Sequence, residues 1–156
     1  MVSSLDLFFG YAVHILPIAS AALWLITLFV PSFHTYSRFC LYVFIGTLLA
    51  IVSSIALKQI CTYLCDACDS TICARPNGYD NYGMPSGHTQ LAVFFAVFIA
   101  LVYPSLATVT AAILFSVYMG YTRVIVFNMH TTSQVIAGAI VGIAQAYATY
   151  MVYSRK

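Results

Sequence analysis

The sequence predicts an all-α integral membrane bundle of about five transmembrane helices, and three observations support this. Of the 156 residues, 62% are hydrophobic and only 6% are charged, whereas soluble domains carry about 25% charged residues. The apolar residues gather in stretches of about 20, the length that crosses a bilayer as a helix. Most charged side chains lie between or near the ends of these stretches. The net charge of +2 is too small to indicate nucleic acid binding.

The apolar stretches follow one another along the chain as candidate spans. They run approximately from Phe8 to Val30, Phe39 to Ile60, His88 to Tyr103, the turn at Pro104–Ser105 to Tyr121, and Thr132 to Tyr153. The first is treated as a retained helix, because it lacks the basic start and short apolar core of a cleaved signal peptide. The chain is then one membrane-embedded domain, 1–156, whose motif-bearing core covers about 39–153. Gly138 and Gly142 predict close helix packing, within the protein or with a partner.

Five crossings place the two polar loops, 61–87 and 122–131, on one membrane face together with the N-terminus. The positive-inside rule does not decide the orientation, because equal numbers of basic residues lie on the two faces. Basic residues flank the spans on both faces: Lys58, Arg75 and Arg123 on the loop face, and Arg38, Arg155 and Lys156 on the other. If the loop-face residues are engaged in a site, the free ones favour a cytoplasmic C-terminus. We therefore expect a multi-pass protein of an endomembrane (endoplasmic reticulum-like) or the cell membrane, with a lumenal or extracytoplasmic site.

Polar side chains from distant segments should meet on the loop face. They lie in the loops or at helix ends: Lys58, Arg75, Ser86, Gly87, His88, Arg123 and His130. Three cations with few nearby carboxylates indicate a polyanion, and arginine forks match phosphate oxygens in pairs. A helix starting after Pro85 adds free N–H groups and a positive dipole end, with Ser86 as cap or phosphate donor and Gly87 allowing close approach. Two histidines can divide the chemistry between attack on phosphorus and protonation of the leaving oxygen.

These residues resemble the three motifs of the type-2 phosphatidic acid phosphatase superfamily, over roughly the last hundred residues. The matches are Lys58 with Arg75-Pro76, then Pro85-Ser86-Gly87-His88, then Thr122-Arg123 with His130. The resemblance implies a metal-independent lipid phosphatase without a cofactor. In it, His130 attacks phosphorus and forms a phosphohistidine, and His88 protonates the leaving group. The residues implied to bind phosphate are Lys58, Arg75, Ser86, Gly87 and Arg123.

The stretches Tyr82–Gln90 and His130–Gln134 resemble one branch, the dolichyl-diphosphate phosphatases. That resemblance implies a polyprenyl diphosphate substrate, cleaved to the monophosphate and phosphate. Two alternatives stay open. Phosphate-binding motifs do not recognise the hydrocarbon chain of the lipid, so a broader phosphatidate or lipid phosphate phosphatase agrees with the same residues. A catalytically silent membrane scaffold of the same fold is the second. The expected partners are the lipid substrate and the bilayer, with no nucleic acid.

Three departures from the superfamily pattern bear on these expectations. Lys58 lies further from Arg75 than is usual, and the gap from Arg123 to His130 is one residue longer. Gln134 stands where many members have aspartate, one helical turn after the nucleophile. Its amide oxygen could orient the His130 imidazole, but it brings no charge to stabilise an imidazolium. Gln134 and the displaced lysine favour the scaffold, whereas the intact histidines favour an enzyme.

The first loop holds a cluster of cysteines: Cys61, Cys65, Cys68 and Cys73. On a lumenal face, four cysteines predict two disulfides, with three connectivities open. On a cytosolic face they could hold zinc, although their spacing matches no common zinc signature. We favour disulfides and predict no metal site.

Overall fold

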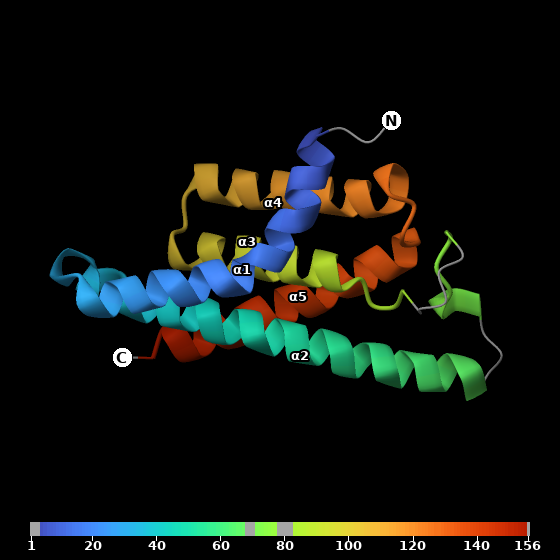
Figure 1. Ribbon diagram of the computed structural model, residues 1–156, viewed down its shortest axis with the longest axis horizontal. Coiled ribbons are helices and arrows are strands. Elements are labelled where there is room, and N and C mark those ends of the chain that lie inside the picture. The colour runs from blue at the N-terminus through green and yellow to red at the C-terminus, as the bar shows by residue number, and fades with distance from the viewer. Residues whose placement is uncertain (1–3, 68–70, 78–82, 156) are drawn as a thin grey trace.

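The computed structural model describes residues 4–67, 71–77 and 83–155, and within these ranges the only regular elements are helices. In chain order they are α1 (Ser4–Phe29), the 3₁₀ helix η1 (Pro31–Tyr36), α2 (Ser37–Ala67), the short η2 (Thr71–Cys73), α3 (Gly87–Val102), α4 (Leu106–Tyr121), the π-helical η3 (Thr122–Val126) and α5 (Thr132–Tyr153). Figure 1 shows their arrangement. The predicted all-α bundle is confirmed.

Helix length and composition identify a membrane protein. Three described stretches are long and apolar enough to cross a bilayer, namely Pro31–Asp66, Leu106–Val126 and Thr132–Tyr153. Two shorter apolar helices, Ile15–Phe29 and Gly87–Val102, accompany them. Large apolar side chains face outward, which suits a lipid environment in which helices satisfy their own backbone groups.

Two predicted boundaries were wrong. The second span was expected to end near Ile60, but α2 continues to Ala67. Between Gly46 and Pro76 there is no glycine or proline to interrupt it, so the helix outruns its apolar stretch. The loop expected at 122–131 starts with five π-helical residues of η3.

Helix α3 packs closely against α5. A Cβ added at Gly138 would lie 2.4 Å from the Ser86 carbonyl oxygen, and one at Gly142 would lie 2.4 Å from the Gln90 carbonyl oxygen. The glycine pair therefore lets the two backbones touch, which confirms the predicted packing role within this chain. The start of α3 is thus fixed against the first turns of α5.

A buried layer of polar side chains ties α2, α3 and α5 together. The two N–H groups of Gln90 Nε2 are shared among three acceptors, the Ala50 carbonyl (3.1 Å), Ser53 Oγ (2.9 Å) and Gln145 Oε1 (3.0 Å). Gln145 Nε2 in turn donates to Ser53 Oγ. Within a bilayer such groups must find partners inside the protein. The network fixes the relative positions of the three helices whose ends carry the expected site residues.

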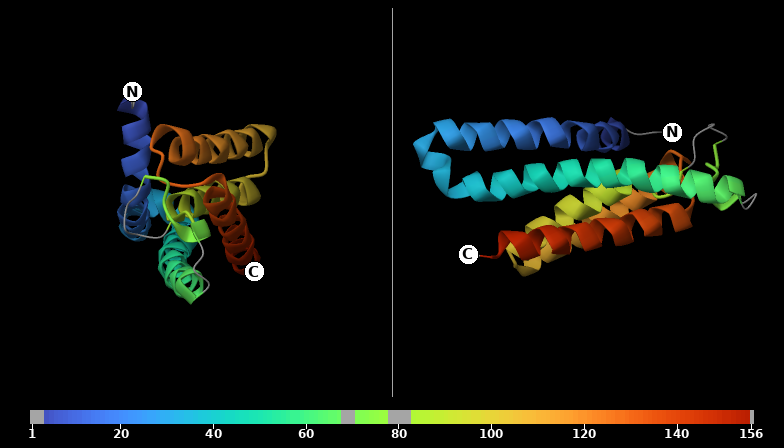
Figure 2. Two further views of the ribbon diagram at one scale, coloured as in Figure 1. Left: turned by 90° about the vertical axis from the view of Figure 1, so that its right-hand side faces the viewer. Right: turned by 90° about the horizontal axis from the view of Figure 1, so that it is seen from below.

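The two ends of the bundle differ. The loops between α2 and α3 and between η3 and α5 lie at one end, and η1, the α3–α4 turn and the C-terminus lie at the other (Figures 1 and 2). At the second end, Arg38 donates to the carbonyls of Tyr153 (2.6 Å) and Arg155, and its guanidinium lies over the rings of Tyr42 and Tyr153. Arg38 is therefore engaged with the end of α5, not free as the orientation argument assumed. Lys156 lies outside the described residues.

Candidate active site

His130 and Gln134 form the centre of the site. His130 precedes α5 and is only 3% exposed. Thr131 caps α5 through a capping box, in which its hydroxyl accepts from the Gln134 N–H and its own N–H donates to Gln134 Oε1 at 3.2 Å. The same Oε1 lies 3.2 Å from His130 Nδ1. The cap thus holds the Gln134 amide against the imidazole.

The other end of the Gln134 amide determines the His130 tautomer. Gln134 Nε2 donates to the carbonyl oxygens of Ile72 (3.1 Å) and Ala74 (2.8 Å). Because carbonyl oxygens only accept, this end must be the NH₂ group, and the end facing His130 must be the oxygen. His130 Nδ1 therefore carries the proton and donates it to Oε1. In the neutral ring, the Nε2 lone pair is left free for attack.

Electrostatics keep this imidazole neutral. Burial, and then the positive charge of Arg75, lower the pKa of His130 from 6.5 to about 4. The charges of Lys58 and Arg123 act in the same direction, and the hydrogen bond to Gln134 opposes them. The ring is thus neutral at neutral pH, with Nε2 unprotonated as a nucleophile requires. The same interactions place all three predicted cations around His130.

Arg123 and Arg75 keep buried donors that have no partner among the described residues. These atoms are Arg123 Nε and Nη2 and Arg75 Nε. Arg123 is 3% exposed, with its guanidinium 4.7 Å from the centre of the Phe127 ring. Buried polar atoms are normally hydrogen-bonded, so donors of this kind indicate a ligand that accepts. A tetrahedral oxyanion supplies such acceptors.

The longer spacing between Arg123 and His130 is taken up in η3. The Phe127 N–H donates to the Thr122 carbonyl at 2.9 Å, five residues back where an α-helix would reach four. The N–H groups of Met129 (3.0 Å) and His130 (3.3 Å) then return to the Arg123 carbonyl. The turn therefore joins the arginine directly to the histidine, despite the additional residue.

The Ser86–Gly87 turn agrees with one part of the prediction and contradicts another. Ser86 stands at the N-cap of α3 but its side chain makes no capping bond; its hydroxyl bonds Thr89 Oγ1 at 3.0 Å, and its N–H donates to the Gln134 carbonyl at 3.0 Å. The capping alternative for Ser86 is wrong, because its hydroxyl bonds the Thr89 hydroxyl instead of a backbone N–H. Its role as a phosphate donor stays a prediction. A Cβ at Gly87 would lie 2.5 Å from Ser54 Oγ and 4.0 Å from Lys58 Nζ. Gly87 thus lets α2 and its lysine approach the turn.

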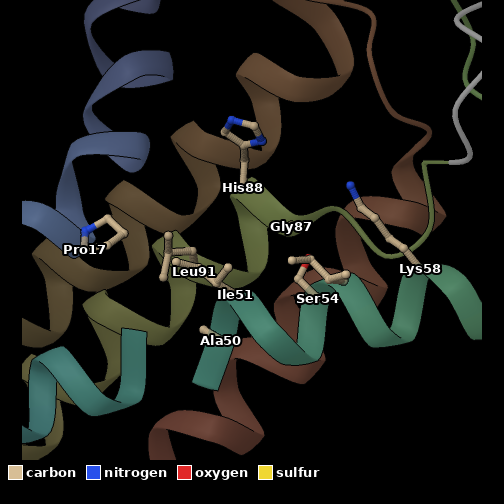
Figure 3. A pocket seen from close by; sticks show the side chains of 9 residues that line it. Pro17, Ala50, Ile51, Ser54, Lys58, Gly87, His88 and Leu91 are labelled. Carbon is tan, nitrogen blue, oxygen red and sulfur yellow. The ribbon is translucent and has the colours of Figure 1, made fainter. Parts of the chain in front are cut away.

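Lys58 and His88 line one cavity of about 260 Å³ between α1, α2 and α3. Figure 3 shows the two side chains on either side of Gly87, with Ser54 below. The remaining lining is apolar: Pro17, Ala50, Ile51, Ile55 and Leu91. His130 does not line this cavity and is linked to the Ser86 turn through Gln134.

The geometry agrees with a family comparison. The sequence-family model of the PAP2 superfamily matches residues 59–156 of the chain. The chain belongs to the PAP2 superfamily. Membership indicates a phosphatase that acts on lipid phosphates. No curated protein and no solved structure shows a match to the chain.

The cysteine cluster of this PAP2 protein forms a disulfide between Cys65 and Cys73. Cys61 keeps a free thiol, so its predicted disulfide is wrong, and Cys68 lies outside the described residues. Cys61 and Cys65 both lie on α2, and Cys73 pairs with only one of them. Within the described residues, no group of three or more His, Cys, Asp or Glu side chains could hold a metal ion.

Sequence reasoning missed one residue of this PAP2 site, Gly83. A Cβ there would lie 2.3 Å from Gln134 Oε1 and 3.1 Å from His130 Nδ1. Its N–H donates to the Cys73 carbonyl at 2.7 Å. The glycine immediately before Met84-Pro85 was the available signal, since glycine marks close approach of backbone to other groups.

Proposed function

We propose that the protein hydrolyses a polyprenyl (dolichyl-type) diphosphate to the monophosphate and phosphate through a phosphohistidine on His130. The observation that carries the proposal is a neutral, oriented imidazole beside buried arginine donors that have no acceptor among the described residues. Such a pair provides a nucleophile and a receptor for the phosphoryl oxygens.

The reaction would proceed in two displacements. His130 Nε2 attacks the terminal phosphorus, the N–P bond forms, and the P–O bond to the lipid monophosphate breaks. His88 gives its proton to the leaving oxygen. A water then attacks the phosphohistidine, His88 takes a proton from it, and phosphate leaves with His130 neutral again. The non-bridging oxygens carry the negative charge of the phosphoryl group. They are held by the side chains of Arg75, Arg123 and Lys58.

The cavity beside Lys58 and His88 supports a lipid ester. Its polar end is lined by Lys58, whose charge acts on the pKa of His130, and its other walls are apolar side chains of α1, α2 and α3. A phosphate group can thus bind at the polar end while an attached hydrocarbon chain leaves along the apolar walls. The choice of a polyprenyl chain rests on the resemblance of 82–90 and 130–134 to the dolichyl-diphosphate phosphatases.

We further propose that this face is lumenal or extracytoplasmic. The Cys65–Cys73 disulfide lies close to His130, because Gln134, which bonds His130, also donates to the carbonyls on either side of Cys73. Disulfides persist in oxidising compartments and are rare on the cytosolic side. An endomembrane or the cell membrane with its site turned away from the cytosol fits this observation.

The test is release of phosphate from a polyprenyl diphosphate in detergent with EDTA present. The parent is compared with His130→Ala and with His34→Ala, a histidine at the opposite end of the bundle whose Nε2 lies 3.2 Å from the Leu28 carbonyl. We expect release by the parent and by His34→Ala and none above background by His130→Ala. An acid-labile, alkali-stable phosphate label should appear on the parent and on His34→Ala but not on His130→Ala.

Three results would refute the proposal. If a folded parent releases nothing from polyprenyl diphosphate or from phosphatidate, the scaffold alternative is correct. If His130→Ala keeps its activity, or if EDTA abolishes that of the parent, the histidine mechanism fails. Preference for phosphatidate would leave the mechanism in place and replace the substrate.

A further inference from the structure

We propose that the Cys65–Cys73 disulfide and Gln134 form one positioning device, in which the cross-linked segment 72–75 holds the Gln134 amide and thereby sets the His130 tautomer and the place of Arg75. The inference rests on the proposed function, because it assigns a role within the same site. It concerns positioning residues, since neither the disulfide nor Gln134 touches the reacting atoms.

The first step is the connection from the disulfide to the amide. Cys65 lies on α2 and is 7% exposed, and Cys73 is 2% exposed at the end of η2. The two carbonyls that accept from Gln134 Nε2 belong to the neighbours of Cys73, Ile72 and Ala74. The cross-link therefore fastens to α2 the short segment that holds the amide, and Arg75 follows directly in the chain.

The second step explains why residue 134 is a glutamine. An amide can donate at one end and accept at the other, so it can serve two carbonyls and the His130 Nδ1–H together. A carboxylate in its place would still accept from His130. It could not donate to the two carbonyl oxygens, so oxygen atoms would face one another without a hydrogen bond. Two departures from the superfamily pattern, the cysteine-bearing insertion and the missing aspartate, are thus complementary parts of one arrangement.

The third step is the consequence of opening the disulfide. Without the cross-link, segment 72–75 can move away, and the buried Gln134 NH₂ loses its two acceptors. With only its oxygen still held, by the Thr131 N–H, the amide can break that bond and turn. It then presents NH₂ to His130 Nδ1, which must become the acceptor. The proton moves to Nε2 and occupies the lone pair needed for attack. Arg75 is released at the same time, so phosphate binding weakens together with turnover.

The experiment compares Cys65→Ser/Cys73→Ser with Cys40→Ser/Cys61→Ser, which keeps the cross-link because both of its cysteines are free thiols. We expect about a 10²-fold lower kcat and a higher KM for the first variant, the effect of a misplacement near 1 Å. We expect parent values for the second. Dithiothreitol should reproduce the loss in the parent and change nothing in Cys65→Ser/Cys73→Ser.

A readout independent of activity is the ¹⁵N NMR shift of labelled histidine, with His130 assigned by its absence in His130→Ala. In the parent and in the free-thiol control, the shifts should report a proton on Nδ1. In Cys65→Ser/Cys73→Ser they should report a proton on Nε2. Gln134→Glu should keep the proton on Nδ1, because its carboxylate still accepts there.

Coupling provides the decisive comparison. Removing the disulfide from Gln134→Met should lower kcat far less than removing it from the parent, since the connection is already broken. If the two effects multiply and the tautomer stays unchanged, the cross-link only stabilises the fold and the inference is overturned. If the parent proves inactive on every lipid, the proposed function fails, while the tautomer shift still decides the inference.

Discussion

Gly83→Ala tests how closely the site depends on the Gln134 amide. The new Cβ would lie 2.3 Å from Gln134 Oε1, so the amide oxygen must withdraw by roughly 1 Å to reach ordinary contact at 3.4 Å. A glutamine end can usually move freely. Here it is held by hydrogen bonds to His130, Thr131 and the carbonyls of Ile72 and Ala74. Withdrawal therefore breaks the 3.2 Å bond that sets the imidazole.

The expected result is a kcat lower by about 10²-fold, the effect of a misplacement of about 1 Å in a catalytic group. KM should change less, because Arg123 and Lys58 do not contact the Gln134 amide. Phosphate release from polyprenyl diphosphate measures both constants, and thermal unfolding in detergent confirms that the variant folds. Gly120→Ala is the matched control, because its Cβ would meet only the end of Val135 at 3.1 Å, away from His130.

Either of two results would refute this reasoning. If folded Gly83→Ala turns over as fast as the parent, the Gln134–His130 hydrogen bond has no part in positioning the nucleophile. A loss in Gly120→Ala equal to that in Gly83→Ala would also refute it, since the effect would then follow from packing in general.

Three further predictions concern charge and burial. Arg75→Gln should raise the pKa of His130 from about 4 toward 6.5, because it removes the largest charge contribution, and an NMR titration measures this shift. The pKa of His130 is lower in the folded state than in the unfolded state, so the unfolded chain binds the proton first as pH falls. The free energy of unfolding of the parent should therefore be greatest above pH 6.5 and decrease as pH falls toward 4. Thermal unfolding across this window should show a steeper decrease for the parent than for His130→Ala. Gln90→Leu should lower the free energy of unfolding by about 1–3 kcal/mol, since it leaves buried polar atoms unpaired. Gln90→Leu/Gln145→Leu should recover part of that loss, and an equal or larger loss would contradict the role of the network.

The position of the site could be predicted because motif order and helix count are local properties. Each motif stands at the end of an apolar stretch, so once the stretches cross the membrane, Lys58, Arg75, Arg123 and His130 must share one face. The structure brings them together around His130. The end of α2 was predicted less well, because hydropathy marks where the apolar stretch stops and the helix continues beyond it.

Details of the site depended on contacts that no local pattern records. The sequence placed Gln134 one turn after His130. Its side chain, however, bonds the backbone of Ile72 and Ala74, which lie 62 and 60 positions away in the chain. Side-chain identity does not reveal which carbonyls another segment presents. For the same reason, four nearby cysteines left three pairings open, and only the fold paired Cys65 with Cys73.

The sequence by itself determined the class of the protein and the face that carries its chemistry, because a bilayer requires long apolar helices and these fix where the polar ends go. Only the tertiary structure decided which nitrogen of His130 carries the proton, which arginine donors are buried without an acceptor, and which cysteines are joined. Those properties depend on distances of about 3 Å between segments far apart in the chain, and such distances are set only when the helices pack.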